Sequence, residues 1–212
     1  MRYIGSKSNL LAQIRELVDT QAPNANSFCD IFAGTGVVGR EFKRTHRIVS
    51  NDILYFSYVL NQAYNGLAAV PQFRKLKLTL KSDPLTFLNS NALDLSNPSE
   101  SDFFYCAFSP AGSAGRQYLT PENALRVDRV RQKIEQWYQE ALINEGERFY
   151  LLASLIEQVP SVSNTTGTYG AYLKHWDKRS LKQLELSELE ICPSVHVNEI
   201  YNKDANDLIH EI

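Results

Sequence analysis

A glycine-rich turn follows a short apolar stretch near the start of the chain and leads into a helical pattern. The turn contains Gly34, Gly36 and Gly39. Glycines at this spacing let the chain turn tightly, bring backbone N–H groups against a ligand and pack the next helix closely on a sheet. The spacing therefore predicts a site for a nucleotide-like cofactor.

Two acids flank this turn. Asp30 comes near the end of an expected strand at residues 27–32, and Asp52 follows a second expected strand at 47–50. A helix N-terminus favours an anionic ligand such as a pyrophosphate, so a carboxylate at Asp30 disfavours a dinucleotide and attracts a cationic group, such as the sulfonium and ammonium of S-adenosylmethionine. Asp52 can accept hydrogen bonds from both hydroxyls of a ribose. The alternative is an ordinary tight loop followed by a solvated acid.

A third acid, Asp204, follows an alternating stretch at residues 195–201 that predicts a strand. Its carboxylate could accept a hydrogen bond from the exocyclic amine of an adenine ring. It could equally cap the short helix expected from Asn206. Both interpretations stay open at this point.

A basic and aromatic segment occupies residues 164–179. Lysine and arginine side chains hold phosphates, and aromatic rings stack on bases or wedge beside them. The formal net charge of −2 gives no overall attraction to nucleic acid, so any contact with DNA must be made through a local basic face. Hydrophobic anchoring of a loop explains the aromatic residues about as well. The candidates for DNA contact are Lys174, Trp176, Lys178 and Arg179.

An α/β fold is expected to position these residues. An amphipathic helix with the apolar residues Leu10, Leu11, Ile14, Leu17 and Val18 comes first. The two strands then alternate with helices, from the glycine turn to about residue 43 and at 54–64. This order predicts half of a doubly wound, Rossmann-like parallel sheet.

The middle of the chain is less regular. Residues 101–108 are compatible with a strand, and 109–115 predict a flexible loop. Thr120-Pro121-Glu122 predicts the start of a helix that runs to about residue 142, and a second helix is expected at 148–159. The basic residues of the first of these helices are interpreted as a solvated face: Arg126, Arg129, Arg131 and Lys133.

Composition limits the cellular setting. The chain has 212 residues, of which 43% are hydrophobic, and its three cysteines are scattered, which disfavours disulfides and zinc sites. No apolar run approaches the roughly 18 residues of a membrane span. We therefore expect a cytoplasmic protein with no metal site and no membrane partner.

Four segments, in this order, resemble the adenine-specific DNA methyltransferases of restriction–modification systems, in the Dam-like group that carries its cofactor motif first and its catalytic motif last. They are Tyr3-Ile4-Gly5-Ser6-Lys7, Asp30-Ile31-Phe32-Ala33-Gly34-Thr35-Gly36, Asn51-Asp52 and Lys203-Asp204-Ala205. The resemblance covers nearly the whole chain. It implies methyl transfer from S-adenosyl-L-methionine to the exocyclic amine of adenine in double-stranded DNA.

The resemblance also implies residue roles. Tyr3 and Lys7 would contact the cofactor, with Lys7 near its carboxylate, while Asp52 would hold the ribose and Asp204 the adenine. The methionyl part would meet Asp30, Phe32, Ala33, Gly34 and Gly36. Residues 1–65 and 195–212 would form a partial methyltransferase core, and 66–194 an inserted, mainly helical target-recognition region.

One family motif is not found in these 212 residues. The catalytic tetrapeptide Asp/Asn/Ser-Pro-Pro-Tyr/Phe holds a flipped adenine. Asp83-Pro84-Leu85-Thr86 and Ser109-Pro110-Ala111-Gly112 both lack the second proline and the aromatic residue. We therefore expect this chain to be inactive by itself. Its first strand should keep an open edge, which favours marginal stability, aggregation or completion by a C-terminal polypeptide.

Two other functions stay possible at this stage. The chain could be a non-catalytic fragment that binds S-adenosylmethionine and DNA, or one half of a split methyltransferase. It could also be a nicotinamide or flavin oxidoreductase that uses the glycine turn, although Asp30 argues against that cofactor.

Overall fold

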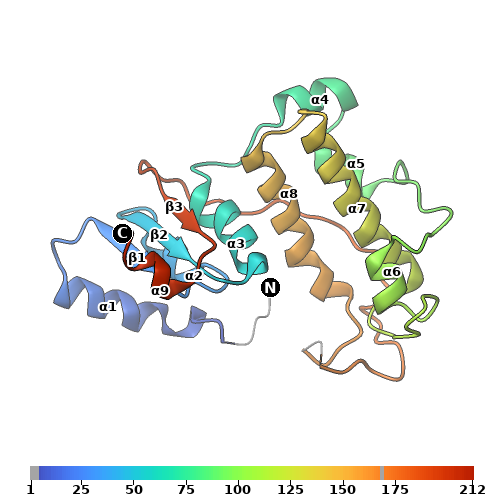
Figure 1. Ribbon diagram of the computed structural model, residues 1–212, viewed down its shortest axis with the longest axis horizontal. Helices are drawn as coiled ribbons and strands as arrows, with labels where there is room; N and C mark the ends of the chain where they lie inside the picture. Colours follow the sequence, from blue (N-terminus) through green and yellow to red (C-terminus); the bar gives the residue numbers. More distant parts are fainter. Residues whose placement is uncertain (1–4, 168–169) are drawn as a thin grey trace. The chain divides into compact units, whose positions relative to one another are not determined.

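The computed structural model describes residues 5–167 and 170–212 and divides into two compact units. The core unit comprises the described residues up to Pro71 together with Leu189–Ile212. The helical unit lies within Gln72–Glu188. In Figure 1 the red C-terminal segment returns to the blue and cyan N-terminal elements, so the core unit is built from both ends of the chain.

The core unit contains a three-stranded parallel sheet in the order β1-β2-β3. The strands are β1 (Ser27–Asp30), β2 (Arg47–Asn51) and β3 (Glu199–Tyr201). Because they are parallel, their carboxyl ends meet at one edge of the sheet. Among the described residues, β1 pairs only with β2, which leaves its other edge open. This confirms the α/β class and an incomplete Rossmann-like sheet, although β1 and β3 are shorter than the sequence predicted.

The core unit also contains helices and helical turns that connect and flank the strands. They are the 3-10 turn η1 (Ser8–Leu10), α1 (Leu11–Gln21), α2 (Val37–Phe42), α3 (Tyr55–Asn61), the π-helical turn η2 (Gln62–Gly66) and α9 (Ala205–Leu208). A hydrophobic cluster of Val38, Phe42 and Ile48 packs against α1 through Leu11, Ile14 and Val18. The Phe42 ring stacks on Phe28 of β1 at a centroid distance of 4.4 Å.

The apolar face predicted for α1 was partly wrong. Leu10 and Leu17 are 49% and 61% exposed. Leu11, Ile14 and Val18 follow the spacing of three and four residues that forms a single helical stripe. Leu10 and Leu17 each stand one residue before that stripe, about 100° away around the helix.

The helical unit contains α4 (Arg74–Leu80), α5 (Pro84–Asn89), α6 (Phe103–Phe108), α7 (Pro121–Gln139), α8 (Glu145–Gln158) and the 3-10 turn η3 (Val159–Val162). Helices α7 and α8 lie side by side (Figure 1). The predicted start of α7 is confirmed, because the Thr120 hydroxyl accepts the Asn123 N–H at 3.2 Å. Asn144 and Glu147 form a capping box at the start of α8.

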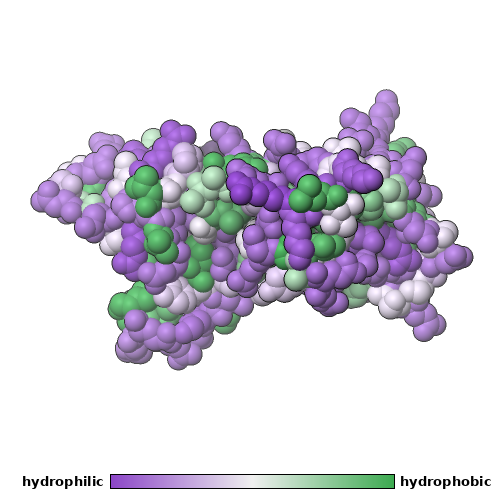
Figure 2. Space-filling model, turned by 90° about the horizontal axis from the view of Figure 1, so that it is seen from above, coloured by the Kyte–Doolittle hydropathy of each residue, from purple (hydrophilic) through white to green (hydrophobic). Residues whose placement is uncertain are grey.

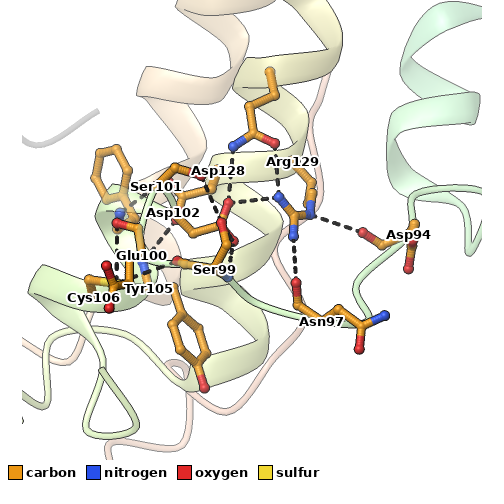
Figure 3. A network of polar contacts seen from close by, with 12 residues as sticks. Asp94, Asn97, Ser99, Glu100, Ser101, Asp102, Tyr105, Cys106, Asp128 and Arg129 are labelled. Atoms are coloured by element: carbon orange, nitrogen blue, oxygen red, sulfur yellow. Dashed lines mark hydrogen bonds and ion pairs between the residues drawn. The ribbon is translucent and has the colours of Figure 1, made fainter. Parts of the chain in front are cut away.

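The strand expected at residues 101–108 is instead α6. The Asp128 carboxylate, on α7, accepts the N–H groups of Phe104 and Tyr105 at 3.0 and 2.8 Å (Figure 3). Asp128 thereby pairs two N–H groups in the first turn of α6, which a helix cannot pair internally. This partner lies more than 20 residues away in the sequence, so no local pattern could indicate it.

The solvated basic face predicted for α7 was also partly wrong. Arg126 is buried and donates to the Leu88 carbonyl at 3.3 Å. Arg129 forms a 2.7 Å ion pair with the buried carboxylate of Asp102 (Figure 3). Burial raises the pKa of Asp102, but hydrogen bonds from Ser99 and Gln132 and the charge of Arg129 outweigh it and lower the pKa. Arg129 therefore holds the segment before α6 against α7, and Arg126 joins α7 to α5.

Within the described residues, no helix is long and apolar enough to cross a membrane. The face shown in Figure 2 is largely hydrophilic, with hydrophobic side chains in separate patches. Several of the large hydrophobic residues that are exposed belong to the carboxyl edge of the sheet, which carries the candidate site: Phe32, Ile53, Leu54 and Tyr55.

Candidate cofactor site and nucleic-acid surface

The glycine turn lies at the carboxyl end of β1. Gly34 and Gly36 have φ angles of +54° and +73°, which only glycine adopts without steric cost. The Gly36 N–H donates to the Ala33 carbonyl at 2.8 Å, and Gly36 is the residue before α2. A Cβ built on Gly34 would meet no atom within 4 Å. The turn therefore offers open space beside its backbone, as a bound ligand requires.

A pocket lies in front of this turn. Gly5, Ser6 and Lys7 line one side, and the other side consists of Ala33, Gly34, Thr35, Val37 and Val38. The structure thus brings Lys7 and the glycine turn together, and their contact with a cofactor stays a prediction. Ala33 is buried and Phe32 is 68% exposed. Tyr3 lies outside the described residues.

Asp30 ends β1 beside the pocket. Its Oδ1 accepts the Phe32 N–H at 3.2 Å. Burial raises the pKa of the carboxyl, and the charge of Asp52 raises it further, while the Phe32 N–H and the charge of Lys7 lower it. Burial dominates, so the ionised form of Asp30 is held in an unfavourable environment that a cationic ligand would improve.

Asp52 lies at the end of β2, and both of its carboxylate oxygens already have a partner. Oδ2 accepts the Gly34 N–H at 2.8 Å, and Oδ1 accepts the Leu54 N–H at 2.9 Å. Asp52 therefore ties the glycine turn to the loop before α3. A carboxylate oxygen can accept more than one hydrogen bond, so capacity for hydroxyl groups remains.

Asp204 caps α9, which was one of its two interpretations. Its Oδ1 accepts the Asn206 N–H at 2.8 Å and the Asn206 side-chain amide at 2.9 Å. The carboxylate is exposed at the same edge of the sheet. A contact with adenine stays a prediction.

Asn51, which sequence analysis left without a role, connects the three strand ends. Its Nδ2 donates to the carbonyls of Ile31 and Lys203 at 3.2 and 3.1 Å, and its Oδ1 accepts the Lys203 N–H at 3.0 Å. The side chain is 1% exposed. Asn51 therefore holds the loops after β1 and β3 beside the end of β2, where Asp30, Asp52 and Asp204 also lie.

The basic and aromatic segment belongs to the helical unit and is organised by Asn164. Its side-chain amide donates to the carbonyls of Gln117 and Leu173 at 3.1 and 2.9 Å, and its Oδ1 accepts the Asp177 N–H at 3.0 Å. An antiparallel bridge joins Thr165 to Tyr172. These contacts give a defined shape to the described residues of the segment, which form no regular helix or strand.

The four candidates for DNA contact differ in exposure. Lys174 and Lys178 are exposed, and Trp176 is half-buried. The Arg179 guanidinium donates to the Thr165 carbonyl at 2.5 Å, so part of its hydrogen-bonding capacity holds the segment itself. Lys174 and Lys178 are therefore the candidates that present their charge most openly.

A parallel sheet with a glycine turn and acids at its carboxyl edge is typical of α/β proteins that bind nucleotide cofactors. The chain belongs to the family of D12 class N6 adenine-specific DNA methyltransferases, whose model matches residues 3–212. This confirms the family that the order of the four motifs indicated.

Named relatives agree with this family. The chain is 45% identical over 214 residues to the Type II methyltransferase M.FokI of Planomicrobium okeanokoites, a match that covers 100% of this chain and 32% of that protein. It is 44% identical over 213 residues to the modification methylase StsI of Streptococcus sanguinis, with coverage of 100% and 32%. With the Type II methyltransferase M.NlaIII of Neisseria lactamica the identity is 37%, with coverage of 100% and 61%.

The chain thus spans about a third of the length of the first two relatives. No solved structure matches it at a significant level.

Proposed function

We propose that the core unit binds S-adenosylmethionine and contributes the cofactor half of a DNA adenine-N6 methyltransferase. The observation that carries this proposal is the convergence of Asp30, Asp52 and the glycine turn at one edge of the sheet, with Lys7 across the pocket. When bound, S-adenosylmethionine supplies an electrophilic methyl group. The core unit binds and orients this cofactor.

Each side chain at this edge suits a different part of the cofactor. The Asp30 carboxylate attracts the ammonium of the methionyl part, and Lys7 attracts its carboxylate. Asp52 accepts hydrogen bonds from the ribose with the capacity left by Gly34 and Leu54. Asp204 accepts one from the adenine amine, and the exposed side chain of Ile53, 65% accessible, offers an apolar contact for the ring.

Calorimetry on this chain tests the cofactor assignment. We expect one equivalent of S-adenosylmethionine to bind, and Asp52→Ala to weaken that binding. Exposed Asp19 on α1 provides a matched control, and Asp19→Ala should leave the affinity unchanged. Tight binding of a nicotinamide dinucleotide without binding of S-adenosylmethionine would instead support an oxidoreductase.

We propose further that the helical unit takes part in target recognition, corresponding to the inserted region at 66–194. Lys174 and Lys178 would contact phosphates, and Trp176 would contact bases. Arg179 would contact phosphates or bases with only part of its hydrogen-bonding capacity, because its guanidinium also donates to the Thr165 carbonyl. The support is the combination of exposed cations with a segment fixed in shape by Asn164.

Gel-shift titrations at several salt concentrations test this surface. Replacing Lys174 and Lys178 with alanine should weaken DNA binding, and each lost phosphate contact should reduce the slope of log affinity against log salt by about 1. Arg131→Ala removes an exposed cation of α7 and serves as the control. Equal effects of the control and the double substitution would argue against a localised surface.

Methyl transfer itself, we propose, needs residues outside these 212. The two partial motifs have structural roles: Asp83 caps α5 by accepting the Leu85 N–H at 2.9 Å, and the Ser109 hydroxyl donates to the Tyr105 carbonyl at 2.7 Å. The open edge of β1 is a suitable place for a complementing segment to add a strand.

A labelled-methyl transfer assay tests this requirement. The chain alone should not methylate DNA, and it should do so when mixed with a polypeptide that carries an Asp-Pro-Pro-Tyr motif. Full activity of the chain alone would contradict the proposal.

A further inference from the structure

Two buried asparagines lie directly beneath the glycine turn. Asn61 ends α3, and Asn65 lies in the π-helical turn η2 that follows it. They are 1% and 0% exposed. Buried amide side chains need hydrogen-bond partners, so the positions of such residues indicate which backbone groups the fold must hold.

Both amides bind carbonyls of the glycine turn. The Asn61 Nδ2 donates to the Gly34 carbonyl at 2.9 Å, and the Asn65 Nδ2 donates to the Gly36 carbonyl at 3.2 Å. The two side chains also bind each other, with the Asn65 Nδ2 at 2.8 Å from the Asn61 Oδ1. The pair therefore acts as one polar unit under the turn.

The π-helical turn that carries Asn65 is itself held in place. The buried Lys43 Nζ donates to the Tyr64 carbonyl at 2.6 Å and to the Leu67 carbonyl at 2.5 Å. The Asn198 side chain donates to the Asn65 carbonyl at 2.7 Å. Single π-helical turns within helices are rare and often occur at functional sites. Here the turn places Asn65 beneath Gly36.

We propose that Asn61 and Asn65 are positioning residues of the cofactor site, an inference that rests on the proposed binding of S-adenosylmethionine. Because a peptide unit is planar and trans, holding the Gly34 carbonyl inward turns the Thr35 N–H outward. The Gly36 carbonyl is held inward by the Asn65 Nδ2 together with the Arg40 N–H, which lies 3.0 Å from it, and this turns the Val37 N–H at the start of α2 outward. Thr35 and Val37 both line the pocket. The asparagines thus aim two donors at the bound ligand.

The same pair explains why two positions of the turn are glycine. A Cβ on Gly36 would lie 2.5 Å from the Asn61 Oδ1, and a Cβ on Gly39 would lie 2.5 Å from the Asn65 Nδ2. Both distances are far below van der Waals contact. The backbone of the turn can approach the amides only because these residues have no side chain.

Gly39 and Asn65 permit a test that separates packing from positioning. Gly39→Ala should lower the thermal midpoint because its Cβ meets the amide. Asn65→Ala should lower both the midpoint and the affinity for S-adenosylhomocysteine, the latter about tenfold, as expected for one lost hydrogen bond. In the double variant the Cβ fills the vacated space, so the midpoint should recover while the affinity stays low.

Gln62→Ala is the matched control, because Gln62 belongs to the same π-helical turn but donates to the Tyr58 hydroxyl at 2.8 Å. It should keep the parent affinity. Recovery of affinity together with the midpoint in the double variant would overturn the proposal, and so would an unchanged affinity of Asn65→Ala. Asn61→Ala, which removes the hydrogen bond to the Gly34 carbonyl, is a second variant that should lose affinity for S-adenosylhomocysteine to the same extent.

Hydrogen exchange in the ligand-free protein separates this inference from the proposed function. The Thr35 amide should exchange differently in Asn61→Ala than in the parent, and the Val37 amide should do so in Asn65→Ala, whether or not any ligand binds. If the parent binds no S-adenosyl compound, the proposed function fails. If instead the exchange at both amides is unchanged, the positioning role fails.

Discussion

Asp30→Asn is the substitution that most sharply separates binding from stability. The Asp30 carboxyl ends β1, and burial raises its pKa, with a further contribution from the charge of Asp52. Asparagine has nearly the same shape, and its Oδ1 can still accept the Phe32 N–H, which lies 3.2 Å from the parent carboxylate. The substitution therefore removes a charge and little else.

The expected loss of affinity follows from the charge. A hydrogen bond to a charged group contributes about 1.5–3 kcal/mol, against about 0.5–1.5 kcal/mol for a neutral pair. The difference of about 1–1.5 kcal/mol corresponds to a dissociation constant raised about tenfold. Because S-adenosylhomocysteine keeps the ammonium and lacks the sulfonium, it should lose as much affinity as S-adenosylmethionine.

The stability of the ligand-free protein should change in the opposite direction. A carboxyl whose pKa is raised on folding destabilises the folded state once it ionises, and this cost disappears at a pH below its unfolded pKa. At pH 7 the thermal midpoint of Asp30→Asn should therefore be at least as high as that of the parent, and the difference should vanish near pH 3.

Calorimetry with both compounds and thermal scans at several pH values measure these effects, with Asp19→Asn as the exposed control. Unchanged affinity for both compounds would refute the role of Asp30. A loss confined to S-adenosylmethionine would refute the ammonium assignment and indicate the sulfonium instead.

Three further substitutions test the internal framework of the two units. Asp128→Ala leaves two helix N–H groups without an acceptor and should lower the free energy of unfolding by about 2–4 kcal/mol in urea titrations, whereas Asp128→Asn should lose less. Burial lowers the pKa of Lys43 from 10.5 to about 8, so as the pH rises the folded state loses this proton before the unfolded state does. The stability of the parent relative to Lys43→Met should then rise by about 3 kcal/mol between pH 8 and 10.5, and a fall would show the sign to be wrong. Asn164→Ala should speed proteolysis of the basic segment and weaken DNA binding, while unchanged proteolysis would argue against its organising role.

The sequence predicted the glycine turn and its flanking acids because their chemistry is local. Gly34 and Gly36 occupy conformations that favour glycine, and Asp30 and Asp52 stand at the ends of apolar strands. The start of α7 was equally local, since Thr120 caps its own helix. Such features depend on residues a few positions apart, which a sequence displays directly.

The asparagines could not be predicted in this way. By local propensity an asparagine indicates a turn or a solvated position. Asn51, Asn65 and Asn164 are instead buried and bind backbone groups that are distant in the sequence. Their roles depend on which carbonyls the fold brings to them. The helix α6 was missed for the same reason, because Asp128 caps it from another helix.

The central claim is that the pocket between Lys7 and the glycine turn binds S-adenosylmethionine, and an NMR titration of this chain tests it most directly. Addition of S-adenosylhomocysteine should shift the backbone amides of Lys7, Gly34, Thr35 and Val37, while the amides of α7 and α8 stay in place. Saturable shifts confined to other residues, or no shifts at millimolar ligand, would contradict the claim.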